Sequence, residues 1–231
     1  NPNISNYPGV IAMGNNLSLS PLYNPSGLVG YWKLDGDTID SSGYGNNGTW
    51  NGTSTERYAG GKVGSYSGNF NGVNDYITCN GDNVLKLESN FSISAWVNFD
   101  QLKDYGYVVL KSSGGGNISV NYRLMSGATT INGLIANGVT SNVVSGSEAT
   151  NGVGAGSWVL LTFTTDGSNL KFYVDGKFKF SAVQTITPVG SSHAMNISNS
   201  VNGVDGQIDD VRVYNRALSA AEIAALYNAT K

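Results

Sequence analysis

The stretch Phe91-Ser92-Ile93-Ser94-Ala95-Trp96-Val97 alternates apolar with small polar side chains almost throughout. Successive side chains of a β-strand point to opposite faces of its sheet, so Phe91, Ile93, Ala95 and Val97 are expected to share one face. The stretch therefore predicts a β-strand with one face in a hydrophobic core.

On both sides of this strand, similar short runs rich in Val, Ile, Phe, Tyr and Thr recur along the chain, separated by clusters of Gly, Asn, Asp and Ser. A spacing of about 8 to 12 residues between such clusters is typical of a β-sandwich or barrel and not of alternating βαβ units. The expected strands are Leu28–Leu34, Ser65–Phe70, Tyr76–Cys79, Phe91–Phe99, Tyr107–Lys111, Ser119–Leu124, Gly133–Ala136, Trp158–Thr164, Leu170–Tyr173, Lys177–Phe180 and Gly206–Tyr214.

Composition narrows the class of protein further. The 231 residues include 13 Tyr, 7 Phe and 4 Trp, an aromatic content that argues against disorder. A net charge of −3 with scattered basic residues makes nucleic acid an unlikely partner. No signal peptide is recognisable, and no apolar run approaches the ~18 residues of a membrane span. These features favour a secreted or cell-surface β protein whose leader or anchor is not in this segment.

The segment Lys171–Phe180 contains an Asp175-Gly176 pair, which is typical of a hairpin turn. A three-residue loop, Val174 to Gly176, would pair Phe172 with Phe178 and give one clean apolar face. A two-residue turn would pair Phe172 with Lys179 and mix the two faces, so the three-residue loop is expected.

The chain ends with its one convincing helix. Ser219-Ala220-Ala221-Glu222 has the pattern of a capping box, with Leu218 and Ile223 at the positions of a hydrophobic staple. Two or three helical turns are marginally stable alone, so this helix is expected to pack on the sandwich.

Residues 1–26 differ from the rest, since they hold four of the five prolines. They are expected to form an extended arm or linker, followed by one domain over residues 27–231. Such an arm can pack on its own domain or link to an upstream segment. A third alternative is a strand donated to the sheet of a neighbouring copy, which would allow self-assembly.

Several motifs in order are similar to one known family. The chain resembles laminin-G-like, concanavalin A-like jelly-roll domains over about residues 27–228, and the resemblance implies an all-β, two-sheet antiparallel jelly-roll sandwich with a short C-terminal helix. The motifs that carry it are Gly27–Asp35, Asp40–Thr49, Asn69–Ile77, Phe91–Val97, Trp158–Thr164, Leu170–Gly176 and Gly206–Ser219.

A structural Ca²⁺ ion is expected near the loop Asp40–Gly48. Calcium takes six to eight oxygen ligands, and this loop offers a carboxylate, two amides and a flexible backbone. The resemblance implies such a site where the loop meets the final strand. The alternative is that Asp40 only forms an Asx turn and Asp209 pairs with Arg212. The candidate ligands are Asp40, Asn46 and Asp209, with Asp35 and Asp210 in reserve.

The resemblance also implies glycan binding. Sugar sites combine an exposed aromatic ring with amide and carboxylate groups, although a tyrosine in such a position is more often an ordinary half-buried strand residue. The candidates, which lie beside turns that carry polar residues, are Trp50, Tyr58, Tyr105, Tyr107 and Tyr122.

Catalysis is not expected. A glycosidase needs two carboxylates held across one bond, and none of the four glutamates has an acid partner at an alternate strand position. Asp209 and Asp210 are adjacent, so they are expected to point to opposite faces. The single His193 and single Cys79 leave no multi-cysteine zinc site and no internal disulfide.

Together these observations predict an extracellular, calcium-stabilised recognition or adhesion module that binds a glycan. The alternative is a structural subunit of a surface filament or pilus that uses residues 1–22 to contact the next copy. The chain could also be a glycoprotein, because Asn-x-Ser/Thr sequons begin at Asn3, Asn16, Asn47, Asn51, Asn90, Asn117, Asn196 and Asn228.

Overall fold

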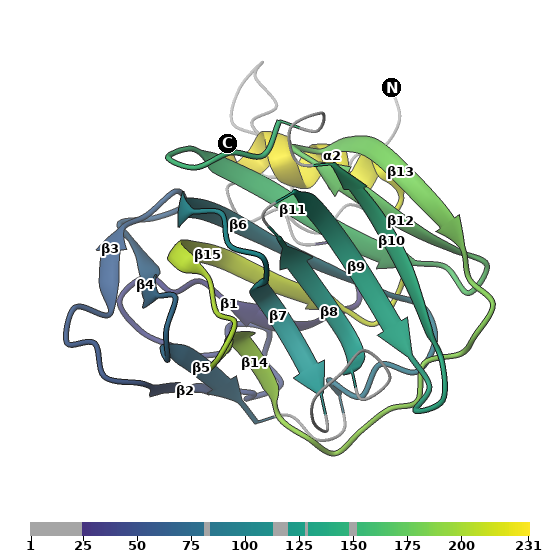
Figure 1. Ribbon diagram of the computed structural model, residues 1–231, viewed down its shortest axis with the longest axis horizontal. Coiled ribbons are helices and arrows are strands. Elements are labelled where there is room, and N and C mark those ends of the chain that lie inside the picture. The colour runs from purple at the N-terminus through teal and green to yellow at the C-terminus, as the bar shows by residue number, and fades with distance from the viewer. Residues whose placement is uncertain (1–24, 81–83, 113–119, 128, 148–151) are drawn as a thin grey trace, which may run out of the picture.

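Two antiparallel β-sheets pack face to face in the computed structural model of the chain (Figure 1). The structure describes residues 25–80, 84–112, 120–127, 129–147 and 152–231. The strands are β1 Leu28–Trp32, β2 Gly48–Asn51, β3 Tyr58–Gly60, β4 Tyr66–Asn71, β5 Tyr76–Cys79, β6 Phe91–Gln101, β7 Gly106–Ser112, β8 Val120–Ser126, β9 Thr130–Ala136, β10 Ser141–Ser147, β11 Trp158–Thr165, β12 Asn169–Val174, β13 Lys177–Val183, β14 Met195–Ser198 and β15 Asp205–Tyr214, and the helix α2 spans Ala220–Thr230.

Each sheet combines a run of consecutive strands with strands that are distant in sequence. One sheet has the order β13-β12-β11-β6-β15-β4-β3, with β1 also paired to β15. The other has the order β10-β9-β8-β7-β14-β5-β2. The two sheets with one C-terminal helix confirm the expected all-β, concanavalin A-like jelly-roll sandwich.

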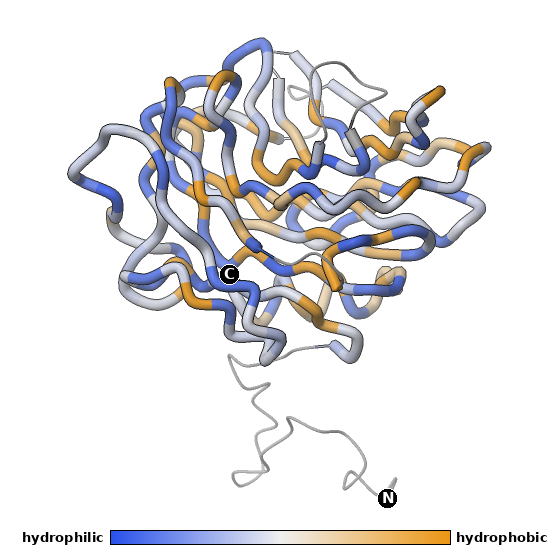
Figure 2. Tube along the Cα trace, turned by 90° about the horizontal axis from the view of Figure 1, so that it is seen from below, coloured by the Kyte–Doolittle hydropathy of each residue, from blue (hydrophilic) through white to orange (hydrophobic). Residues whose placement is uncertain are grey.

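The core lies between the two sheets. Phe91, Ile93, Ala95 and Val97 of β6 are all fully buried in one hydrophobic cluster, as the alternation predicts. Hydrophobic segments run along the strands, and many of the connecting loops are hydrophilic (Figure 2).

Four strands were not expected from the sequence: β2, β3, β10 and β14. They are short or rich in Gly, Ser and Asn, as in the Ser141–Ser147 segment of β10. Their pairing partners hold them in place; β14, for example, pairs with both β5 and β7. Strand formation here depends on neighbouring strands more than on local propensity.

The β12–β13 hairpin corrects the expected register. Val174 pairs with Lys177, so the turn has only two residues, Asp175 and Gly176, both at positive φ (51° and 74°). Positive φ at both central positions is the type I′ geometry that suits the twist of hairpin strands. The expected three-residue loop is therefore wrong.

The apolar face of this hairpin is restored inside the strand. Phe172 pairs with Phe180 and Tyr173 with Phe178, which leaves Lys179 as the extra residue of a bulge. The Phe172 and Phe180 rings stack 5.2 Å apart, whereas the Phe178 side chain is 55% exposed. The bulge therefore brings a phenylalanine opposite Phe172, which the expected three-residue loop was meant to do.

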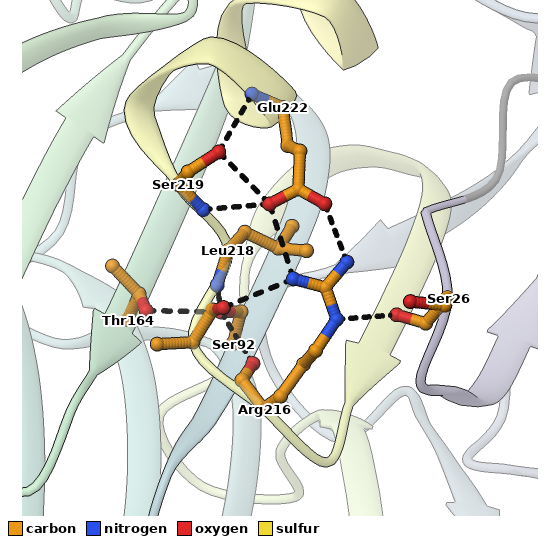
Figure 3. Close-up of polar contacts among 8 residues, drawn as sticks. Ser26, Ser92, Thr164, Arg216, Leu218, Ser219 and Glu222 are labelled. Atoms are coloured by element: carbon orange, nitrogen blue, oxygen red, sulfur yellow. Dashed lines mark hydrogen bonds and ion pairs between the residues drawn. The ribbon is translucent and has the colours of Figure 1, made fainter.

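The helix α2 begins with the expected capping box (Figure 3). The Glu222 amide donates to Ser219 Oγ at 3.3 Å, and the Ser219 amide donates to Glu222 Oε2 at 2.9 Å. Arg216 adds two hydrogen bonds to the same carboxylate and donates a third to the Ser26 carbonyl oxygen. The cap thereby ties the helix to the chain just before β1.

The same helix covers part of the outer face of the eight-stranded sheet. Ile223 packs with Leu218, Tyr173 and Tyr214 in a small hydrophobic cluster. Trp96 Nε1 donates to Thr230 Oγ1 at 2.9 Å. The contact of Ile223 with Leu218 agrees with the predicted staple, and the helix is docked as expected.

The arm expected over residues 1–26 falls mostly on residues 1–24, which lie outside the described residues. The same is true of the strand donation expected for residues 1–22, so self-assembly stays a prediction. Within the described part of the chain, no helix has the length and apolar character needed to cross a membrane.

Candidate functional site

A pocket of about 420 Å³ opens on the outer face of the seven-stranded sheet, at one end of β7, β8 and β9. Leu124 of β8 and Ile131 of β9 point into the core. The residues next to them on each strand therefore point outward. The pocket is lined by Asp104, Tyr105, Arg123, Met125, Thr130 and Asn132.

Strand register brings together residues that are far apart in sequence. Met125 of β8 pairs with Tyr107 of β7 on one side and with Asn132 of β9 on the other. These three side chains form one row across the sheet. Arg123 lies two residues before Met125 in β8, so its side chain is on the same face of the sheet.

Two tyrosines form an aromatic platform beside the pocket. The rings of Tyr105 and Tyr107 are stacked with centroids 6.5 Å apart and an interplanar angle of 28°. Tyr105 is 52% exposed, so one ring can meet a ligand. Tyr107 is half-buried against Leu110, Leu134 and Ala136, which hold it in position.

Arg123 lies under this platform. Its guanidinium carbon is 5.6 Å from the centroid of the Tyr107 ring, and its Nε donates to Asn132 Oδ1 at 3.3 Å. Burial lowers the pKa of Arg123 from its ordinary value, although the group remains a cation because arginine starts so high. Asp104 adds an exposed carboxylate.

This set of groups can bind a polyhydroxylated ligand. An aromatic face accepts the C–H groups of a sugar ring, and Arg, Asn, Thr and Asp side chains supply donors and acceptors for its hydroxyl groups. Of the sequence candidates, the structure brings only Tyr105 and Tyr107 to this pocket.

Trp50 and Tyr58 form a separate cluster at the edge strands β2 and β3. Trp50 Nε1 donates to the Tyr58 hydroxyl at 3.0 Å, and the Trp50 ring packs on Phe70 with centroids 4.8 Å apart. Trp50 thus belongs to the margin of the hydrophobic core. Neither residue lines the pocket on the seven-stranded sheet.

Tyr122 is a correction to the candidate binding residues. It points inward from β8, is fully buried in the core, and donates its hydroxyl to the Leu85 carbonyl oxygen at 2.9 Å. A side chain without exposed surface cannot contact a ligand. Its neighbour Arg123, which the sequence analysis did not name, occupies the outward position instead.

Asp40 organises the loop between β1 and β2. Its Oδ1 accepts hydrogen bonds from the amides of Tyr31 and Ser42, both at 2.9 Å, and its Oδ2 accepts from the Asn46 amide at 2.8 Å. The Ser42 contact is the Asx turn that the sequence analysis held as an alternative. Asn46 donates its side-chain amide to the Val29 carbonyl oxygen.

The remaining acidic candidates serve other parts of the chain. Asp209 Oδ2 accepts from the amides of Lys62 and Val63, both at 2.8 Å. Asp35 Oδ1 accepts from the amides of residues 65 and 66. Asp210 is at φ 51° in a bulge and pairs with Arg212 at 3.0 Å. The expected partner of Arg212 was Asp209, so that alternative was wrong by one residue.

These contacts do not fit a calcium site shared by Asp40 and Asp209. Asp40 accepts from backbone N–H groups through both carboxylate oxygens and Asp209 does so through Oδ2, whereas calcium requires its oxygen ligands to converge on one point. No group of three His, Cys, Asp or Glu within the described ranges could hold a metal ion. The expected calcium ion therefore finds no support in this geometry, and it is tested by a thermal measurement below.

A model of one protein family matches residues 70–224, which is more than half of the chain. Its description is the concanavalin A-like lectin/glucanases superfamily. The chain belongs to this superfamily. A search of curated protein sequences finds no match.

Solved structures share the fold of this superfamily member at low sequence identity. Domain 4 of AbnA, an extracellular arabinanase from Geobacillus stearothermophilus solved with arabinotriose, is 23% identical with a TM-score of 0.69, over 87% of this chain and 98% of that domain. The binding domain of Paraclostridial Mosquitocidal Protein 1 is 16% identical with a TM-score of 0.70, over 87% and 52%. The botulinum neurotoxin type G receptor binding domain is 21% identical with a TM-score of 0.65, over 88% and 51%. The chain thus spans about half the length of these toxin domains.

Proposed function

We propose that this chain is a carbohydrate-binding module and that the pocket beside Tyr105 and Tyr107 is its sugar site. The observation that carries the proposal is the stacked tyrosine pair on the sheet face, next to Arg123 and Asn132 in one pocket. Neighbours of the same fold add support, since AbnA domain 4 was solved with arabinotriose.

The module acts by binding and not by catalysis. Hydrolysis of a glycosidic bond uses two carboxyl groups on either side of the bond. Asp104 is the one acid among the six residues that line the pocket. The partner is therefore a glycan that is held and released unchanged.

An extracellular location is part of the same proposal. It is supported by the description of AbnA as extracellular and by the receptor-binding role of the toxin domains. Protease treatment of intact source cells tests it: loss of the protein from the cells, with cytoplasmic markers retained, is the expected result.

Glycan-array screening followed by calorimetry tests the sugar site. Arabinotriose is the first ligand to titrate, with the strongest array ligand as the second. We expect saturable binding that Tyr105→Ala weakens by about tenfold or more, because the exposed ring of the platform is lost.

The matched control is Tyr66→Ala. Tyr66 is 51% exposed, as Tyr105 is, but it lies in β4 of the other sheet, outside this pocket. If Tyr105→Ala binds as tightly as the wild type, or if both variants lose the same affinity, the sugar does not bind in this pocket.

A further inference from the structure

A second pocket, of about 310 Å³, lies at the opposite end of β6 from the first. Asn90 of this pocket directly precedes β6, whereas Asp104 of the first follows its last residue by three positions. Eleven strand residues span roughly 35 Å. The second pocket, called the rim pocket here, is lined by Val29, Tyr44, Val84, Lys86, Leu87, Glu88, Ser89, Asn90 and Asn215.

The loop organised by Asp40 carries the aromatic ring of the rim pocket. Tyr44 lies between Gly43 and Gly45, both at positive φ, and its amide donates to Ser42 Oγ at 3.3 Å. The Tyr44 side chain is 55% exposed. The three amide hydrogen bonds to Asp40 hold this loop, so the ring is presented by an ordered turn.

Polar residues of other segments line the same pocket as Tyr44. Lys86 and Glu88 form an ion pair at 3.4 Å, and Gly190 packs so closely that a Cβ there would lie 2.5 Å from Glu88 Oε1. The Asn215 amide donates to the Gly27 carbonyl oxygen at 2.9 Å, which fixes that residue beside β1. Lys86, Glu88 and Asn215 thus place hydrogen-bond donors and acceptors around the rim pocket.

We propose that the rim pocket is a second saccharide site, selective for neutral sugars. The Lys86–Glu88 pair balances its own charge, so the pocket offers no net charge to an acidic or basic ligand. Val84 is a partly buried aliphatic side chain at the pocket wall, which is backed by the core residues Val29 and Leu87, and Tyr44 provides an exposed ring for C–H contacts.

Two sites at opposite ends of one sandwich change what the module does. A single pocket attaches the protein to one sugar, whereas two pockets near opposite ends of β6 can bridge two glycan chains or bind a long one twice. This inference adds a site to the proposed function without depending on the first pocket, since the two pockets share no lining residue.

A ¹⁵N NMR titration of the full chain separates the two sites. The probes are arabinotriose, cellotriose and chitotriose, each taken to millimolar concentration, with protein made in bacteria so that the Asn90 sequon stays unmodified. We expect at least one probe to shift the amide signals of Tyr44, Glu88 and Asn90. Signals of Tyr105 and Thr130 report the first pocket in the same spectra.

Variants decide what the shifts mean. Tyr44→Ala should abolish the rim shifts and leave any first-pocket shifts intact, and Tyr105→Ala should do the reverse. Asn215→Ala is the second rim variant, used in case Tyr44→Ala alters the loop. If no probe moves the rim signals, or if they still move in both rim variants, the second site is wrong. If the rim signals move and the signals of the first pocket do not, only the sugar site proposed beside Tyr105 and Tyr107 is wrong.

Discussion

Three aspartates illustrate how surroundings decide the role of a single residue. Asp40, Asp35 and Asp209 each accept at least two backbone N–H groups, although the sequence suggested metal ligands for all of them. A carboxylate can accept hydrogen bonds from N–H donors and can also bind cations, so residue type alone does not distinguish a loop organiser from a metal ligand. Only the positions of the donors make that distinction.

Asp209 should make the stability of the protein depend on pH. Its Oδ1 is buried with no hydrogen-bond partner among the described residues, and burial raises its pKa to about 7. Between about pH 4 and 7 the folded state therefore binds more protons than the unfolded state. The contribution is fully present below about pH 4 and is lost as the pH rises to 7, so Tm from scanning calorimetry should fall between about pH 4 and 7 and level off above that.

Asp209→Asn should flatten this pH profile, because the amide oxygen can still accept from Lys62 and Val63 but no longer ionises. Asp35→Asn is the matched control: Asp35 also accepts two backbone amides but is exposed, so its variant should keep the wild-type slope. An unchanged slope in Asp209→Asn would assign the pH dependence to another group.

At the scale of elements, local patterns predicted where most strands and the helix lie but not how they pair. The strand Tyr76–Cys79 and the capping box at Ser219 lie where the pattern placed them. The β12–β13 hairpin does not, because a bulge at Lys179 and a longer turn satisfy the same alternation. Choosing between them requires the neighbouring sheet and helix.

This register can be tested with two matched substitutions. Phe180→Ala should lower the free energy of unfolding by about 2 kcal/mol, since its ring stacks on Phe172 at the edge of the core. Phe178→Ala should cost less than about 1 kcal/mol, because that side chain is mostly exposed. Urea denaturation measures both. A loss for Phe178→Ala as large as that for Phe180→Ala would instead favour the three-residue loop, which places both rings on the apolar face.

At the scale of the whole molecule, both pockets exist only because distant segments meet. The first pocket joins β7, β8 and β9, and the rim pocket joins the Asp40 loop to the segments before β6 and after β15. The sequence indicated Tyr105 and Tyr107 as candidates because they lie beside turns. Arg123, Met125 and Asn132 carried no comparable signal, since their shared face depends on strand register.

Metal removal tests whether any ion contributes to the assembled sandwich. We expect equal Tm values in EDTA and in millimolar CaCl₂, because the oxygens of Asp40 already hold three backbone amides. A Tm that rises with calcium and falls again with EDTA would contradict this expectation and restore the calcium site predicted from the sequence.

The sequence by itself determined the class of fold, the face that β6 buries and the capped C-terminal helix, since alternation and capping depend on residues a few positions apart. Tertiary structure alone decided the hairpin register, the burial of Tyr122, the amide partners of Asp40 and Asp209, and both pockets. These features depend on contacts between residues far apart in the chain, such as the Ser92 hydroxyl and the Arg216 carbonyl oxygen, 124 positions apart. Such contacts form only when the sheets close, and local sequence patterns do not encode which segments then become neighbours.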